Sequence, residues 1–219
     1  MERLSVLRRL VADELQDTRL FKALFSNALD PAAYIRYLQN AYYYAQYSPR
    51  IMALAASRCM DTHPELAAYL LHHAEEERGH DLWALEDLRD FQVSEAQARS
   101  ALPVPACAAM VGYIHYVAGF SNPVGVFGWM YILEAVGHDL GSQVASRLKA
   151  SFGGAIAGVR FVARHGDTDV RHAQELAQEI RNHVRHDQDL AQITYVAEVV
   201  ADLYPRMFRE VGGEEPRWA

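Results

Sequence analysis

The sequence has few cysteines and no long apolar stretch. Cys59 and Cys107 are the only cysteines among 219 residues, and they lie far apart and outside any paired-cysteine motif. This pattern argues against a disulfide framework or a zinc ribbon and favours buried thiols. The longest nearly unbroken apolar stretch, about residues 126–136, is far shorter than the roughly 20 residues that cross a bilayer.

The sequence also lacks a basic run and a recognisable signal segment. Its formal net charge is −7, and no cluster of lysines and arginines is available to neutralise phosphates, which argues against a nucleic-acid partner. Arg3, Arg8 and Arg9 are interleaved with acids in a helical pattern and do not precede the apolar core of a signal peptide. We therefore expect a cytoplasmic protein that neither enters a membrane nor binds nucleic acid.

Helical periodicity is present along almost the whole chain. Apolar side chains recur every three or four residues, and no stretch alternates in the manner of a strand. Asp30 followed by Pro31 is typical of a helix start, and His63-Pro64 opens a predicted helix that reaches about Phe91. The prediction is an all-α, single-domain bundle of about seven helices over residues 1–211, followed by a polar tail over 212–219.

One predicted helix carries a possible metal-binding motif. His73, Glu77 and His80 are spaced by four and then three residues, so they share one helical face. A Glu-x-x-His pair on an inward face is a common way for helical bundles to bind iron or manganese. The alternative is a solvated acidic face, because Glu75 and Glu76 are neighbours in the sequence.

The same spacing recurs later in the chain. His165, Asp169 and His172 are again separated by four and three residues, and three potential ligands on one stripe favour a metal site. Gly166 followed by Asp167 opens an alternative, in which one helix ends and another begins, and His165 leaves the stripe.

Glu134 lies between these two motifs, within a run of large apolar residues. A buried carboxylate needs a proton, a cation or a metal, because removing its charge from water is costly. His138, one turn further on, either joins it or lines a pocket. Carboxylates with imidazoles suit iron or manganese, and the absence of thiolates argues against structural zinc.

The phrase FGWMYILEAVG around Glu134, the spacing back to His80, and the H-x3-D-x2-H run resemble the heme-oxygenase-like diiron oxidases. The resemblance covers about residues 34–190 and implies a heme-oxygenase-like fold with a non-heme centre of two iron ions (Fe2+/Fe3+) that react with O2. The ligands that match the family directly are His80, Glu134, His165, Asp169 and His172. The remaining ligand is left open between Glu77 and His73, where some members of the family carry an acid.

The resemblance implies an O2-activating oxidase or oxygenase acting on a small amine, an amino-acid-derived compound or a fatty-acid-like compound. N-oxygenation, oxidative decarboxylation and carbon–carbon cleavage are the reactions expected. The alternatives are a metal-free enzyme of cofactor metabolism, similar to pyrroloquinoline-quinone synthase or the thiaminases, and a non-catalytic binding protein. A homodimer is the usual assembly of such bundles. The residues expected to line the substrate pocket are Tyr43, Tyr47, Trp129, Tyr131 and His138.

Overall fold

The computed structural model describes the backbone of residues 1–153 and 157–214, and the side chains of these residues except 167–170. The described residues form helices and no strands, as the periodicity predicts. The elements are α1 (Glu2–Asp17), α2 (Arg19–Phe25), α3 (Pro31–Ala45), α4 (Ser48–Cys59), α5 (Pro64–Glu76), α6 (His80–Asp90), α7 (Glu95–Ser100), α8 (Pro105–Phe120), the 3-10 turn η1 (Pro123–Gly125), α9 (Val126–Ser151), α10 (Arg160–His183) and α11 (Asp187–Val211).

The described part of the chain has more helices than the seven or so expected, because several predicted helices are divided by a turn. Thr18 is extended and caps α2 with its side chain, which separates α2 from α1. Gly79 adopts a left-handed conformation (φ 92°) between α5 and α6, where one continuous helix was expected. At Gly166 the sequence left a helix break open as an alternative, but α10 continues through this residue without a break.

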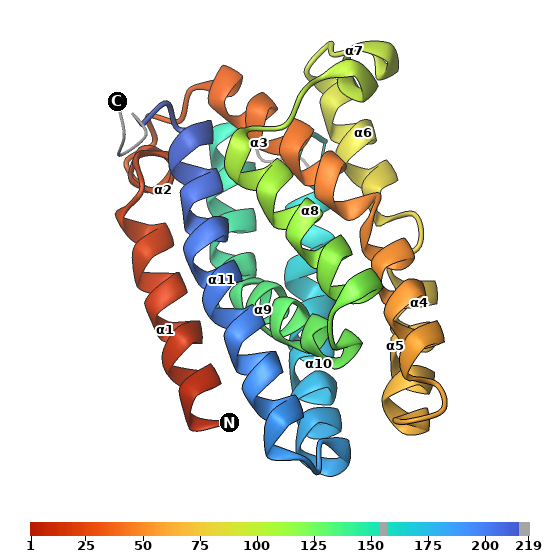
Figure 1. Cartoon of the computed structure of the whole chain (residues 1–219). Helices are drawn as coiled ribbons and strands as arrows, with labels where there is room; N and C mark the ends of the chain where they lie inside the picture. Colours follow the sequence, from red (N-terminus) through yellow and green to blue (C-terminus); the bar gives the residue numbers. More distant parts are fainter. Residues whose placement is uncertain (154–156, 215–219) are drawn as a thin grey trace.

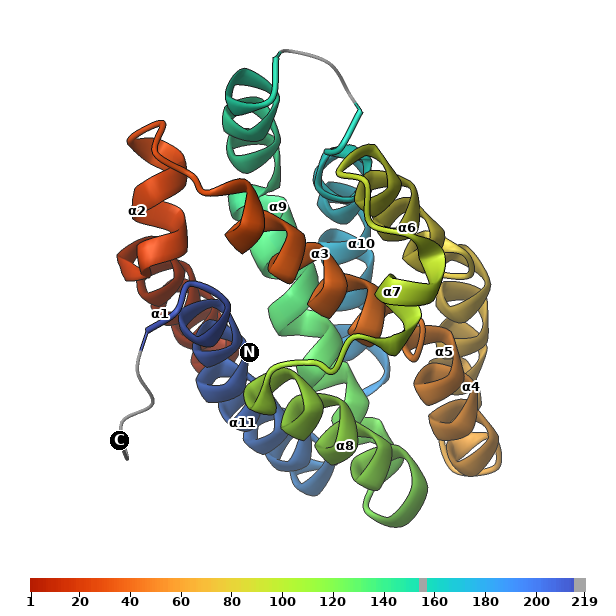
Figure 2. The same ribbon diagram turned by 90° about the horizontal axis from the view of Figure 1, so that it is seen from above.

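Helix α9 runs through the middle of the bundle (Figures 1 and 2). It packs against α1 and α11 on one side and against α10 on the other. Its residues from Val126 to Ile132 are all buried, which explains the apolar run in the sequence. Within the described residues, every helix is either too short or too polar to pass through a lipid bilayer.

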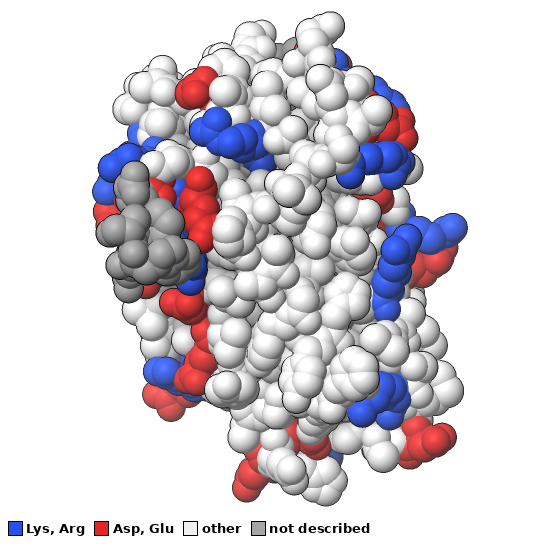
Figure 3. Space-filling model, turned by 45° about the horizontal axis from the view of Figure 1, so that its top comes forward, with Lys and Arg blue, Asp and Glu red and all other residues white. Residues whose placement is uncertain are grey.

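Charged side chains avoid one broad strip of the surface. In Figure 3 this strip is white, with basic and acidic side chains at its margins. Helix α8 lies at the front of the molecule in Figure 1, and its sequence contains no Asp, Glu, Lys or Arg. Tyr116 and Phe120 are exposed on it and stack on each other.

Two glycine positions bring α9 unusually close to its neighbours. A Cβ atom on Gly128 would lie 2.1 Å from the carbonyl oxygen of Ile193 in α11. A Cβ atom on Gly141 would lie 2.7 Å from the Cα atom of Gly166 in α10. The glycines therefore fix the distances at which α10 and α11 cross α9.

The crossing at Gly128 generates a stability prediction. Gly128→Ala should lower the free energy of unfolding by about 1–3 kcal/mol, although alanine favours helices, because the methyl group collides with backbone atoms that cannot move independently. Gly112→Ala is the control, since a Cβ atom on this glycine of α8 meets nothing within 4 Å. It should stabilise the protein by up to about 1 kcal/mol. Urea denaturation measures both, and equal effects of the two variants would contradict the close crossing.

Candidate metal centre

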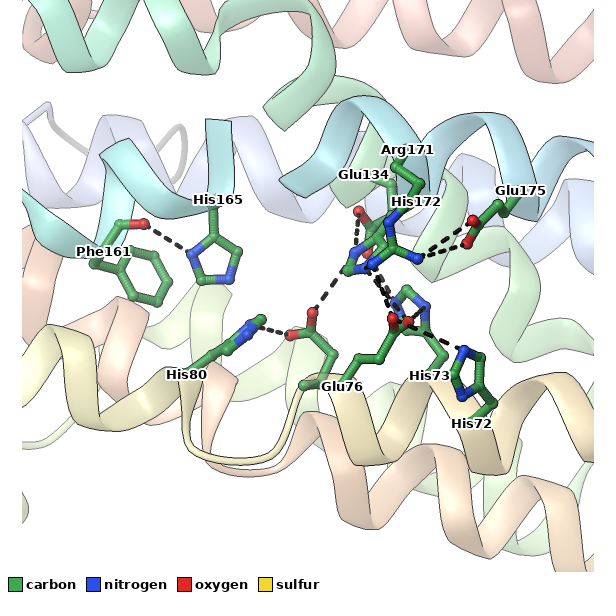
Figure 4. Close-up of polar contacts among 11 residues, drawn as sticks. His72, His73, Glu76, His80, Glu134, Phe161, His165, Arg171, His172 and Glu175 are labelled. Atoms are coloured by element: carbon green, nitrogen blue, oxygen red, sulfur yellow. Dashed lines mark hydrogen bonds and ion pairs between the residues drawn. The ribbon is translucent and has the colours of Figure 1, made fainter. Parts of the chain in front are cut away.

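Four helices converge on one buried cluster of imidazoles and carboxylates. Helix α5 supplies His73, and Glu77 lies just beyond its end. Helix α6 begins with His80, helix α9 supplies Glu134, and α10 supplies the last two histidines of the cluster, His165 and His172. His73 and His172 have no exposed side-chain surface. Figure 4 shows His73, His80, Glu134, His165 and His172 extending from their helices into the space between them.

The cluster divides into two groups of possible ligands. In the four-residue group, His73, Glu77, Glu134 and His172 each offer one atom within 4.8 Å of the others. In the three-residue group, the same holds for Glu77, His80 and His165. Ligand atoms on opposite sides of one metal ion lie about 4.4 Å apart at most with bonds near 2.2 Å, so small movements would close either group around an ion.

Glu77 belongs to both groups, which makes it the carboxylate placed to bridge two ions. Glu134, which lies between the two motifs in the sequence, is the other candidate for this role. In the structure, Glu134 contacts only the four-residue group: its Oε1 lies 3.1 Å from Nε2 of His73, and its Oε2 lies 3.5 Å from Nδ1 of His172. Glu77 instead reaches both ways, with Oε2 3.1 Å from Nδ1 of His80 and Oε1 3.9 Å from Nδ1 of His172.

The turn at Gly79 makes this double contact possible. Glu77 follows the last residue of α5, and His80 is the first residue of α6, so the Glu-x-x-His motif spans two helices and does not lie on one helical face. The ring of His80 stacks on Trp83, with ring centroids 3.9 Å apart, and this contact holds the imidazole against the cluster.

A buried carboxylate on α6 places the second stripe of histidines. The oxygens of Asp87 accept hydrogen bonds from the backbone N–H groups of Arg160 (2.9 Å) and Phe161 (2.8 Å) at the start of α10. One turn later, Nδ1 of His165 donates to the Phe161 carbonyl oxygen at 2.8 Å. Because that nitrogen is occupied, Nε2 is the atom left for the cluster.

Five buried polar atoms of the cluster make no hydrogen bond of good geometry among the described residues, although an oppositely charged group lies 3.1–3.9 Å from each of them. They are His73 Nδ1, Glu76 Oε2, His80 Nδ1, Glu134 Oε2 and His172 Nδ1. Unpaired buried polar atoms are rare and costly, so five of them around one point call for an additional partner. Metal ions fit this requirement, because the atoms are imidazole nitrogens and carboxylate oxygens.

The charges of the cluster also suit cations. Burial works against ionisation of Glu134, but the imidazoles of His172 and His73 outweigh it and lower its pKa to about 2. Burial likewise opposes the charge of Glu77, and the imidazoles of His80 and His165 lower its pKa. Burial lowers the pKa of His165. Burial opposes the charge of His172, but Glu134 outweighs it and raises the pKa of that imidazole. The ionised carboxylates supply the negative charge that divalent ions need, and such ions displace protons from imidazoles when they bind.

Glu76, which the sequence suggested is part of a solvated face, lies behind the four-residue group. Its Oε2 lies 3.5 Å from Nε2 of His172 and 3.9 Å from Nδ1 of His73, the ring nitrogens on the side away from Glu134. Its Oε1 accepts a 2.8 Å hydrogen bond from Arg171. The sequence pattern does not predict this position of Glu76. Residues 75–77 are all glutamates, and helical periodicity does not separate them because α5 ends within them.

The remaining predicted residues are placed as follows. The Asp169 side chain lies outside the described residues, so its role as a ligand stays a prediction. A cavity with about 1120 Å³ of open space, its mouth included, adjoins Glu77, Glu134 and His165, and Trp129 lines it. Tyr43, Tyr47, Tyr131 and His138 do not line this cavity. Tyr43 and Tyr47 pack against each other, Tyr47 also contacts His115, and His138 lies 2.8 Å from Arg8.

The tyrosine-rich stretch does reach the cavity, but through other residues. Tyr34, Tyr37 and Tyr44 of α3 line it. They are spaced by three and seven residues, so they share one face of α3, and this helical register was the signal that could have selected Tyr44 over its neighbours.

Comparison with known proteins agrees with this site. A family model described as an iron-containing redox enzyme matches residues 35–204. Among curated proteins, no relative matches the sequence.

Solved structures show the fold. A domain of unknown function with a heme oxygenase-like fold from Shewanella denitrificans superposes with a TM-score of 0.86 and 22% identity, covering 94% of this chain and 89% of that one. A TenA homolog from Pseudomonas syringae has a TM-score of 0.78 and 14% identity, covering 96% and 91%. Heme oxygenase-1 from Synechocystis, solved in complex with heme, has a TM-score of 0.71 and 15% identity, covering 97% and 93%. The chain therefore has the heme oxygenase-like fold.

The position of Glu77 in both groups predicts a difference in metal stoichiometry between two variants. Glu77→Ala should weaken the binding of both ions. His165→Ala should remove only the ion of the three-residue group and leave one ion bound. Titration of the metal-free protein with Co2+, followed by calorimetry and metal analysis, measures this. Identical stoichiometries for the two variants would contradict a shared carboxylate.

The contacts of Glu76 predict an indirect effect on metal affinity. Glu76→Gln should weaken binding at the four-residue group by about 10- to 100-fold, the usual effect of removing a carboxylate that orients metal-bound histidines. Glu75→Gln is the matched control, because Glu75 is the preceding residue and pairs with Arg78 in solvent. Its affinity for Co2+ should equal that of the unaltered protein, and a comparable loss in both variants would rule out a specific role for Glu76.

Proposed function

Because the chain belongs to the family of iron-containing redox enzymes, we propose that it is a non-heme diiron oxidase or oxygenase. The observation that carries this proposal is the pair of adjoining ligand groups that share Glu77. Two neighbouring sites with a common carboxylate suit two ions of the same element, and the mixture of oxygen and nitrogen ligands suits iron.

The protein residues would hold the two ions as follows. His73, Glu134 and His172 hold one ion together with Glu77, and His80 and His165 hold the second together with the same Glu77. When bound, ferrous iron supplies electrons for the reduction of O2. The helices contribute burial: His73 and His172 are fully enclosed, which keeps bulk water away from that side of the centre.

The cavity next to the cluster is the proposed substrate site. It opens onto Glu77, Glu134 and His165, so a bound molecule would lie beside both groups. The substrate classes that remain in view are an amine, an amino-acid-derived compound and a fatty-acid-like compound.

A metal-free enzyme of cofactor metabolism is the main rival, because a TenA homolog shares the fold. The thiaminase-like form of this rival would depend on a nucleophilic thiol in the cavity. Neither cysteine lines the cavity: Cys59 is buried in α4 and Cys107 in α8, where burial raises the pKa of its thiol to about 12. A thiol with that pKa is not a nucleophile at neutral pH, which favours the diiron proposal.

The proposal predicts that iron and oxygen chemistry depend on both histidines of α10. The protein loaded anaerobically with ferrous iron should bind two irons per chain and consume O2 with a transient visible absorbance. His165→Ala and His172→Ala should each reduce O2 consumption to the background of free iron, with helicity by circular dichroism unchanged. His186→Ala, which removes an exposed imidazole at the start of α11, is the control. Full O2 consumption in either α10 variant, or no bound iron in the unaltered protein, would overturn the proposal.

A further inference from the structure

The outward side of α8 is apolar along its whole length. Its exposed residues recur every three or four positions and therefore form one stripe along the helix: Pro105, Ala109, Gly112, Tyr116 and Phe120. We call this stripe the α8 face. None of its side chains carries a charge, in keeping with the strip of the surface that charged side chains avoid in Figure 3.

Apolar side chains of the flanking helices widen the α8 face. Leu54 of α4 is exposed, and its Cδ2 atom lies 3.6 Å from the position that a Cβ atom on Gly119 would take. Tyr195 is exposed on α11, which packs along the other side of α8 (Figure 1). Charge appears at one end of the face, where Arg58 donates hydrogen bonds to carbonyl oxygens at the end of α8.

The exposed aromatic side chains make this surface large. Phe120 is 81% exposed, Tyr195 58% and Tyr116 56%. With about 200 Å² for each fully exposed aromatic side chain, the three together expose roughly 400 Å². This area lies within the range of the largest apolar patch on a monomer. It is also about half of the surface that each partner buries in a standard protein–protein interface, so the α8 face is large enough to form the centre of one.

Gly112, at the middle of the α8 face, has no packing role among the described residues of one copy. A glycine inside a helix is less favourable than an alanine, so its presence calls for a reason. Gly128 and Gly141 of α9 have one, because neighbouring backbones approach them closely. A Cβ atom on Gly112 would meet nothing within 4 Å. An exposed glycine in the centre of an apolar stripe suits the close approach of a backbone from outside the chain.

The shape of the α8 face is complementary to itself. When a second α8 crosses it antiparallel with Gly112 at the crossing, residues on opposite sides of this glycine meet. Tyr116 then packs on the partner's Ala109, and Phe120 packs on the partner's Pro105, so that each large side chain faces a small one. A parallel crossing would place the same residues of the two copies against each other, large on large and small on small, which packs less well.

Charge also favours a second copy as the occupant of the α8 face. The chain has a formal net charge of −7, so two copies repel each other except where both present an uncharged surface. We propose that two copies form a two-fold symmetric dimer through the α8 face, with the two helices antiparallel and crossing at Gly112. This inference is independent of the proposed function, because no residue of the face lines the cavity or belongs to either ligand group.

Sedimentation velocity at increasing concentrations of the full chain tests the dimer. The unaltered protein should pass from monomer to dimer. Tyr116→Arg and Phe120→Arg should each raise the dissociation constant of the dimer at least about tenfold, because each places a charge against an uncharged surface of the partner. Leu10→Arg, which alters an exposed leucine of α1, is the control and should dimerise normally. A protein that stays monomeric at every concentration, or arginine variants of α8 that dimerise normally, would overturn the proposal.

Gly112→Ala separates the stability of one copy from its association with another. In dilute protein the alanine should stabilise the chain, as predicted above for this variant. In concentrated protein its methyl group should hold the two backbones apart and raise the dissociation constant of the dimer at least about tenfold. Urea denaturation and sedimentation measure the two effects, which have opposite signs. A Gly112→Ala protein that dimerises with unaltered affinity would contradict a crossing at this glycine.

Disulfide crosslinking tests the antiparallel orientation. Cys59 and Cys107 are buried, so a thiol introduced on the α8 face is the one available for oxidation. Oxidation of a mixture of Ala109→Cys and Tyr116→Cys chains should link one variant to the other. Neither variant alone should form a link, because the two copies of either position lie about 10 Å apart along the helices, too far for a disulfide. Links within each variant alone, or no link in the mixture, would overturn the antiparallel arrangement.

Discussion

Burying several carboxylates in the middle of a helical bundle is the constraint on which this structure depends. The side chains of Glu77 and Glu134 are only 11% and 12% exposed, and such groups are costly unless opposite charges and hydrogen bonds surround them. Imidazoles from α5, α6 and α10 stabilise the ionised form of both acids and so lower their pKa values. The unpaired atoms that remain define the position of further positive charge.

The backbone around the cluster contains local exceptions that serve this arrangement. The left-handed Gly79 separates α5 from α6 and lets Glu77 face both ligand groups. Gly141 and Gly166 let α9 and α10 approach at the level of the cavity, and Asp87 holds the first turn of α10 so that His165 enters the cluster. Each of these residues lies on or next to a helix that carries a possible ligand. The same contacts therefore determine both the packing of the bundle and the geometry of the site.

Much of this organisation could be predicted from the sequence, and the limits have physical reasons. Periodicity gave the all-α class, and the spacing of His165 and His172 gave the inward stripe of α10, because both depend on local geometry. Glu134 stood out because an acid in an apolar run must find a partner. The break at Gly79 was not predicted. Many helices tolerate a single glycine in their interior, so one glycine within a helical pattern does not by itself predict a helix end.

Other features depend on tertiary contacts that local patterns do not contain. Glu76 looks identical to Glu75 in the sequence, and only the approach of α10 places His172 and Arg171 beside it. Similarly, nothing local in the sequence separates Tyr43 and Tyr47, which were predicted to line the pocket, from Tyr44, because all three are tyrosines of one cluster. The face that α3 turns toward α9 and α10 decides which of these residues lines the cavity.

The two ligand groups differ in the number of ligands they offer. Both reach the cavity, because Glu77 and Glu134 of the four-residue group and Glu77 and His165 of the three-residue group line it. Among the described side chains, the three-residue group offers fewer ligands, and a metal ion with fewer protein ligands keeps positions for other molecules. An ion held by Glu77, His80 and His165 would therefore have more positions open to a molecule in the cavity. On this argument the four-residue group anchors the centre, and the three-residue group is where substrate and O2 would meet.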